Sequence, residues 1–115
     1  MPEIDVKTLT GLVGRAIARQ RVRCELTQEQ VAERLGIGNE AVSRIERGIV
    51  MPNIERLVAL ASIFGCETAD LLTEASARPE DQARHLQSLL GTLGSEDRQL
   101  VMGMVERLVE RLARR

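Results

Sequence analysis

Glycines placed at intervals divide this chain into short segments, and they limit its fold more than any other feature. Each follows a stretch that favours helix by its apolar spacing or its composition. A glycine in that place commonly ends a helix in the left-handed conformation. The chain therefore predicts a series of short helices joined by tight turns. The helices are expected to end at Gly36, Gly48, Gly65, Gly91 and Gly94.

The composition favours an all-α fold. Only 1% of the residues are aromatic, with Phe64 the single phenylalanine and no tryptophan or tyrosine, whereas helix-favouring residues are abundant. The lack of aromatics also argues against a surface on which the bases of single-stranded nucleic acid would stack. At 115 residues the chain has room for one small domain and an appendage, so a two-domain enzyme is excluded.

Apolar spacing predicts seven helices. We expect them over about 8–23, from the capping-box pattern at Thr27 to Gly36, over about 39–47, 54–64 and 67–72, and then from Pro79 and from Ser95 onward, with a polar linker over 73–78. Ala41, Val58 and Leu72 are among the apolar residues assigned to the inner faces. The chain is expected to divide into a compact N-terminal region, 1–77, and a C-terminal region, 78–115.

The segment Gly36-Ile37-Gly38 joins two short helices, the second of which has a polar outer face. This is the helix-turn-helix arrangement, which places its second helix in the major groove of DNA. The surrounding residues are LTQEQVAERLGI over 26–37, VSRIERG over 42–48, then Pro52, Leu60-Ala61 and Phe64-Gly65. Over about 9–72 this run resembles the Xre/Cro-type, or lambda repressor-like, helix-turn-helix family. The resemblance implies a five-helix DNA-binding domain and a dimeric transcriptional regulator.

The second helix of this motif carries the candidate base contacts. Asn39, Glu40, Ser43 and Arg44 lie near its N-terminus, the end that reaches base edges in this motif. Arg44 can donate two hydrogen bonds to guanine, Asn39 can pair with adenine, and Glu40 can accept from cytosine. The alternative is a solvated face, on which Glu40 pairs with Arg44 or orients it.

Three residues are candidates for phosphate contacts: Thr27, Gln28 and Arg47. The first two lie at a helix N-terminus, where free backbone amides and the helix dipole attract anions. Arg15, Arg19 and Arg23 suit phosphate contact or solvent equally well. The resemblance further implies that Arg21 and Glu46 form a partly buried ion pair, a structural role.

The segment after Gly48 departs from the family's pattern. Ile49-Val50-Met51 stands where a lysine or arginine is often found near the DNA backbone. We expect no phosphate contact by a side chain there. The backbone amides of this segment can still donate to DNA, or the apolar trio can contact another subunit.

The C-terminal region lies outside the resemblance. Its last helix has a broad apolar stripe that something must cover, either the preceding helix in a hairpin or a second copy of the chain. One hairpin has too little core to stand alone, so a homodimer is expected. The expected dimer interface consists of Leu100, Met104, Leu108 and Leu112.

No residue pattern for catalysis is present. His85 is the only histidine, and neither it nor Cys24 and Cys66 have the spacing of a nucleophile, metal or disulfide site. We therefore expect no enzyme activity, no cofactor and no metal, and two reduced cysteines. No segment is apolar enough for a membrane span and the N-terminus is acidic where a signal peptide would be basic, so a cytoplasmic protein is expected.

The leading hypothesis is a cytoplasmic, homodimeric regulator, a repressor, that binds double-stranded DNA at a palindromic operator. The alternative is an antitoxin or adaptor whose main role is to bind another protein through the apolar tail or the 49–51 segment. An adjacent gene for a small toxin would favour the alternative.

Overall fold

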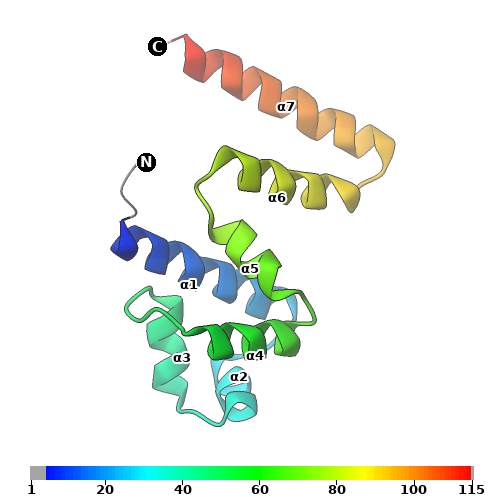
Figure 1. The fold of residues 1–115 in the computed structure, drawn as a ribbon. Helices are drawn as coiled ribbons and strands as arrows, with labels where there is room; N and C mark the ends of the chain where they lie inside the picture. The colour runs from blue at the N-terminus through cyan, green and yellow to red at the C-terminus, as the bar shows by residue number, and fades with distance from the viewer. Residues whose placement is uncertain (1–4, 115) are drawn as a thin grey trace. The chain divides into compact units, whose positions relative to one another are not determined.

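The computed structural model describes residues 5–114, which form helices joined by turns and contain no strand. The predicted all-α class is confirmed. Residues 1–4 and Arg115, which belong to the predicted regions 1–77 and 78–115, lie outside the described residues. Seven helices follow one another in the described part (Figure 1): α1 Val6–Arg23, α2 Gln28–Leu35, α3 Asn39–Glu46, α4 Ile54–Phe64, α5 Thr68–Ala75, α6 Pro79–Gly91 and α7 Ser95–Ala113.

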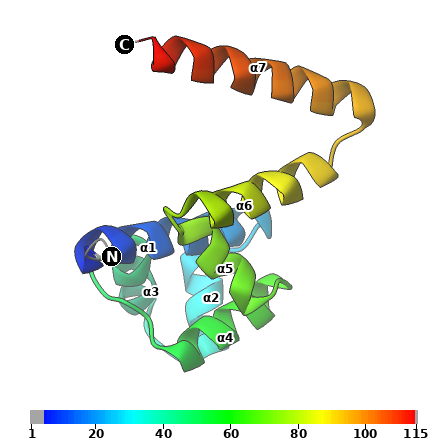
Figure 2. The ribbon, with the colours of Figure 1, turned by 45° about the horizontal axis from the view of Figure 1, so that its top comes forward.

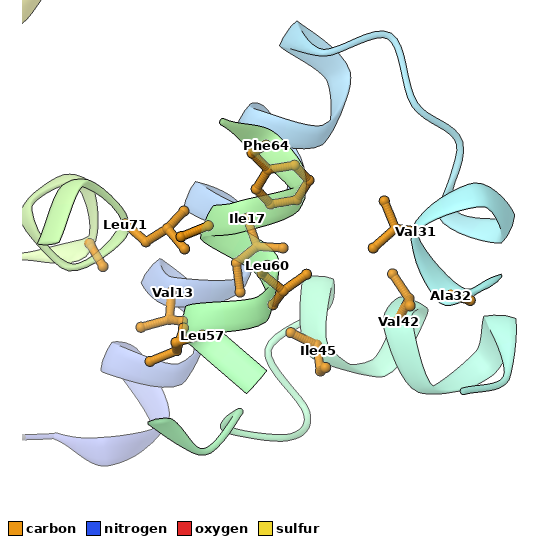
Figure 3. Close-up of a cluster of buried hydrophobic side chains, with 12 residues drawn as sticks. Val13, Ile17, Val31, Ala32, Val42, Ile45, Leu57, Leu60, Phe64 and Leu71 are labelled. Atoms are coloured by element: carbon orange, nitrogen blue, oxygen red, sulfur yellow. The ribbon is translucent and has the colours of Figure 1, made fainter. Parts of the chain in front are cut away.

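The chain divides into two compact units after Gln82. In the first unit, α1 packs against α3, α4 and α5, while α2 packs against α3 and α4. Figure 3 shows the side chains that these helices bury together. The largest fully buried members are Ile17, Leu60, Leu71, Val13, Val31 and Val42. This core fixes the positions of α2 and α3, the two helices of the predicted motif.

The helix ends follow from local chemistry at most of the predicted places. Thr27 caps α2, and its side chain and that of Gln30 form the reciprocal capping box, as predicted. Asn53 caps α4 by accepting a hydrogen bond from the amide of Arg56 at 2.8 Å. Three glycines adopt the left-handed conformation expected of them: Gly36, Gly48 and Gly65.

The predicted left-handed conformation is wrong for the two later glycines, Gly91 and Gly94. Gly91 is the last residue of α6, and Gly94 is the N-cap of α7 with φ −72°. Neither has a positive φ. The spacing of glycines therefore marked the turn between α6 and α7 correctly but gave the wrong conformation at both positions.

Several residues assigned to the core are exposed instead. Val58 keeps 51% and Leu72 keeps 46% of its surface in solvent, and Ala41 is also exposed. Helical spacing defines a stripe about 100° wide, but neighbouring helices cover only its centre. Helix α5 also continues to Ala75, which is buried, so residues 73–75 belong to the helix and not to the predicted linker.

Helices α1 and α3 meet at two glycines. A methyl group added at Gly14 would collide with the carbonyl oxygen of Ile45 and would lie 2.7 Å from that of Glu46. One added at Gly48 would lie 2.7 Å from the Cα of Gly11. These contacts need glycine because the two backbones approach too closely for any larger residue. They bring the end of α3 against α1.

The second unit consists of the rest of α6 and all of α7, which Figure 2 shows joined by a sharp turn. Neither helix buries a single residue. An open groove of about 530 Å³ lies between them, lined by Leu86 and Leu90 of α6 and by Met102 of α7. This unit therefore lacks a core of its own.

Candidate nucleic-acid interface

Buried side chains of α2 and α3 determine which side of α3 faces solvent. Val31 of α2 and Val42 and Ile45 of α3 are buried in the common core. Because these residues anchor one side of α3, its opposite side faces solvent. Asn39, Glu40 and Arg44 are exposed there, and Ser43 is half-buried. The four predicted base-contacting residues thus lie in the first two turns of one helix, and three of them are exposed.

A shallow groove brings the predicted phosphate-contacting residues of α2 next to α3. It measures about 660 Å³ and is lined by Thr27, Gln28 and Asn39 together with Arg21. Thr27 lies at the N-terminus of α2, where the helix dipole favours an anion. Glu25 and Glu29 also line this groove, so an approaching phosphate meets both signs of charge.

Glu46 ties together three parts of the motif. Its carboxylate accepts two hydrogen bonds from the guanidinium of Arg21, at 2.7 and 3.1 Å, and one from the amide Nε2 of Gln28 at 3.0 Å. Arg21 donates a further bond to the carbonyl of Leu26 at 2.9 Å. Hydrogen bonding to Glu46 raises the pKa of Arg21. The Arg21 and Glu46 side chains are therefore paired as the family resemblance implied.

The contact between Gln28 and Glu46 was not anticipated from the sequence. It joins the first residue of α2 to the last residue of α3, 18 positions apart. A glutamine amide has two N–H groups and one carbonyl oxygen. One N–H is held by Glu46, so the side chain is oriented while its other groups remain available to a ligand.

Glu40 pairs with Arg47 rather than with Arg44. Arg47 donates through Nη2 to the Glu40 carboxylate at 2.9 Å and through Nε to the hydroxyl of Ser43 at 3.2 Å. Both side chains of the ion pair are more than half exposed. Within residues 5–114, Arg44 has no carboxylate within 4.0 Å. The alternative pairing of Glu40 with Arg44 is therefore wrong for this structure.

A second polar cluster, also missed from the sequence, fastens α1 to α5. Gln20 is buried and donates through Nε2 to Glu74 at 2.6 Å. Arg19 lies 3.6 Å from the other oxygen of the Glu74 carboxylate. This places the Arg19 guanidinium beside α5, with an acidic partner of its own. The two cysteines are free and half-buried, and Cys24 donates through Sγ to the carbonyl of Phe64.

The predicted dimer residues of α7 are all exposed. Leu100 keeps 61%, Met104 51%, Leu108 59% and Leu112 52% of their surfaces in solvent. They repeat every four residues, so they share one long stripe of the helix. Among residues 5–114 no helix is long and apolar enough to span a membrane, and no cluster of three potential metal ligands occurs.

Comparison with known proteins supports the helix-turn-helix assignment. A helix-turn-helix family model matches residues 17–71, from the middle of α1 into α5. The uncharacterized HTH-type transcriptional regulator y4dJ of Sinorhizobium fredii is 37% identical over 68 residues, which are 59% of this chain and 88% of that protein. This chain belongs to the helix-turn-helix family of transcriptional regulators.

Other relatives match more of the chain at lower identity. The cryptic phage CTXphi transcriptional repressor RstR of Vibrio cholerae is 24% identical over 91 residues, 79% of this chain and 82% of that protein. A crystal structure of the clp gene regulator ClgR from Corynebacterium glutamicum has a TM-score of 0.56 and 27% identity, covering 64% of this chain and 91% of the other. A second ClgR structure, at 24% identity, has a TM-score of 0.58 and covers 79% and 92%. The shared fold thus includes the predicted motif.

Proposed function

We propose that the protein is a sequence-specific DNA-binding repressor. The observation that carries the proposal is the exposed side of α3, which offers Asn39, Glu40 and Arg44 beside Thr27 and Gln28 of α2. An exposed helix of this width fits the major groove, and the helix-turn-helix arrangement uses it in that way. A relative named as a transcriptional repressor favours repression over activation.

Within this proposal, the residues have separate roles. Arg44 has no acidic partner among the described residues, so its guanidinium is free to donate to the O6 and N7 of a guanine. Asn39 and Ser43 contact neighbouring bases, and Glu40 contacts a base through its free oxygen while it is held by Arg47. Thr27, Gln28 and Arg47 contact phosphates and fix the register of the protein on the duplex.

We further propose that the protein binds a palindromic operator as a homodimer. One such domain contacts a half-site, and two are needed at a spacing of about 34 Å. Region 1–77 is proposed to bind DNA and region 78–115 to form the dimer. The support is the exposed stripe of α7: a 19-residue helix that packs on little else is marginal alone in water, and large apolar patches are rarely left uncovered.

Selection of bound duplexes from a random pool tests the DNA-binding proposal. A selected sequence with two inverted half-sites is expected. If no sequence is enriched over many rounds, the protein does not act by reading DNA, and the role of antitoxin or adaptor takes its place.

Sedimentation of Met104→Glu tests the dimer. A charge in the stripe must be desolvated to form the interface, so the variant is expected to be a monomer at micromolar concentration. Gln99→Glu, which adds the same charge to α7 outside the stripe, is the matched control and is expected to remain a dimer. A dimeric Met104→Glu would place the interface elsewhere, with the 49–51 segment as the next candidate.

A further inference from the structure

A second groove opens beside the outward face of α3. It measures about 470 Å³ and lies between α3 and the segment that joins α3 to α4. Its apolar lining comes from Ile37 in the turn, Ala41 of α3, and Val50 and Met51 of the joining segment. It therefore contains two of the three residues at which the chain departs from its family, and it borders the helix proposed to enter DNA.

The groove lies beside the proposed base-contacting residues because the exposed Ala41 forms part of its lining. Ala41 lies between Glu40 and Arg44 in sequence, and all three are exposed and line the groove. Val50 keeps 41% and Met51 38% of their surfaces in solvent. An apolar strip thus runs directly along the polar residues proposed to contact bases.

The rim of the groove is positively charged. Arg44 borders it from α3 and Arg56 from α4, and neither has a carboxylate within 4.0 Å in the described part of the chain. The one acid at the rim, Glu40, is held by Arg47. An apolar protein surface seated here would desolvate two unpaired cations. Double-stranded DNA combines the required opposite charge with an apolar group, because thymine presents a methyl group in the major groove.

We propose that this groove takes the 5-methyl group of a thymine next to the base contacted by Arg44. The inference rests on the proposed DNA-binding function. Ala41 is small enough to let the methyl group approach, and Val50 and Met51 cover it from the other side. Where a lysine or arginine near the DNA backbone is often found in the family, the segment Ile49-Val50-Met51 thus provides a contact that depends on the DNA sequence.

Replacing thymine by deoxyuridine removes this methyl group and leaves the hydrogen-bonding edge of the base unchanged. Each thymine of the selected operator is replaced in turn, and the dissociation constant is measured by fluorescence anisotropy. At one thymine of the half-site we expect affinity to fall about 4-fold, and about 14-fold when both half-sites are changed, from the burial of one methyl group per site. No sensitivity at any thymine, with operator binding intact, would overturn the inference and leave the proposed function standing.

Met51→Ser removes an apolar wall and is expected to reduce the preference for thymine over deoxyuridine to below about 2-fold. Ile49→Ser is the matched control, because Ile49 is exposed in the same segment but does not line the groove. It should keep the preference. Equal loss in both variants, or conversion of the dimer to a monomer by Met51→Ser, would also overturn the inference. Failure of the wild-type protein to bind any selected DNA would instead refute the proposed function.

Discussion

The buried pair of Arg21 and Glu46 gives a sharp prediction, because α3 carries a second glutamate–arginine pair for comparison. In the first pair the Arg21 side chain is 17% exposed and that of Glu46 only 6%. In the second, Arg47 is 55% and Glu40 75% exposed. The residue types and ion-pair distances are alike, at 2.7 and 2.9 Å, but Glu46 is more buried and accepts two hydrogen bonds from Arg21 and one from Gln28, whereas Glu40 accepts one from Arg47.

Glu46→Gln is expected to cost about 2 to 3 kcal/mol of unfolding free energy. Removing one member of a fully buried pair costs about 3 to 5 kcal/mol, since the remaining charge is left without a partner. The cost expected here is below that range, because the Arg21 side chain remains partly exposed to solvent and keeps its hydrogen bond to the carbonyl of Leu26. Glu40→Gln should cost below about 1 kcal/mol, as for other exposed pairs. The helix dipole alone would give the opposite order of costs. It stabilises the charge of Glu40, in the first turn of α3, and destabilises that of Glu46, in the last turn.

Urea unfolding followed by circular dichroism at 222 nm measures both costs, because the chain has no tryptophan or tyrosine to report by fluorescence. With a slope of about 1.5 kcal/mol per M, Glu46→Gln should lower the midpoint by about 1 to 2 M. The double variant Arg21→Met with Glu46→Gln should recover part of the loss, because no charge then remains buried. If Glu46→Gln costs no more than Glu40→Gln, the buried and more extensively hydrogen-bonded pair is no stronger than the exposed one, and the reasoning is refuted.

Three further results are expected. Gly14→Ala should lower the free energy of unfolding by about 1 to 3 kcal/mol, because it forces α1 away from the carbonyl oxygens of α3. Gly11→Ala should be neutral or slightly stabilising, because a methyl group added there meets nothing within 4 Å; the reverse order of the two variants in thermal melts would contradict the close approach. Burial raises the pKa of the Cys66 thiol, so less thiolate is present at pH 8 in the folded protein than in urea. Cys66 should therefore react with iodoacetamide more slowly in the folded protein, as followed by peptide mass spectrometry. Equal rates would show that the thiol is fully accessible. Operator affinity should fall with salt with a log-log slope of about −0.9 per phosphate contacted, and a flat response would favour a protein partner over DNA.

Local signals in the sequence were sufficient to predict most of the helices. The capping box at Thr27, the N-cap at Asn53 and the left-handed Gly36 and Gly65 depend on residues within one turn of each other. Such signals do not depend on the rest of the fold. Gly91 and Gly94 show the limit of such signals: both mark the turn correctly, but Gly91 is still within α6 and Gly94 is the N-cap of α7.

The patterns in the sequence did not predict several contacts between side chains that are far apart in the chain or on one exposed face. Gln28 and Glu46 are 18 positions apart, and Glu40 pairs with Arg47, whose side chain also donates to Ser43, and not with Arg44. Ala41 is exposed in a groove between α3 and the joining segment, and the apolar spacing of α3 does not distinguish it from the buried Val42 and Ile45. A buried glycine on the inner face of a predicted helix, as at Gly14, was the one available signal for the close crossing of α1 and α3.

The central claim is that Arg44 reads a base while Gln28 contacts only the backbone of DNA. Anisotropy titrations of the wild-type protein, Arg44→Ala and Gln28→Ala against the selected operator and a random duplex test it directly. For Arg44→Ala each half-site loses one bidentate base contact, so the ratio of operator to random affinity should fall by about 5- to 150-fold per half-site, and by the square of that factor for the homodimer. Gln28→Ala should weaken binding to both duplexes by the same factor and leave the ratio unchanged. Equal losses on the two duplexes for Arg44→Ala would contradict the claim that α3 reads the operator through this residue.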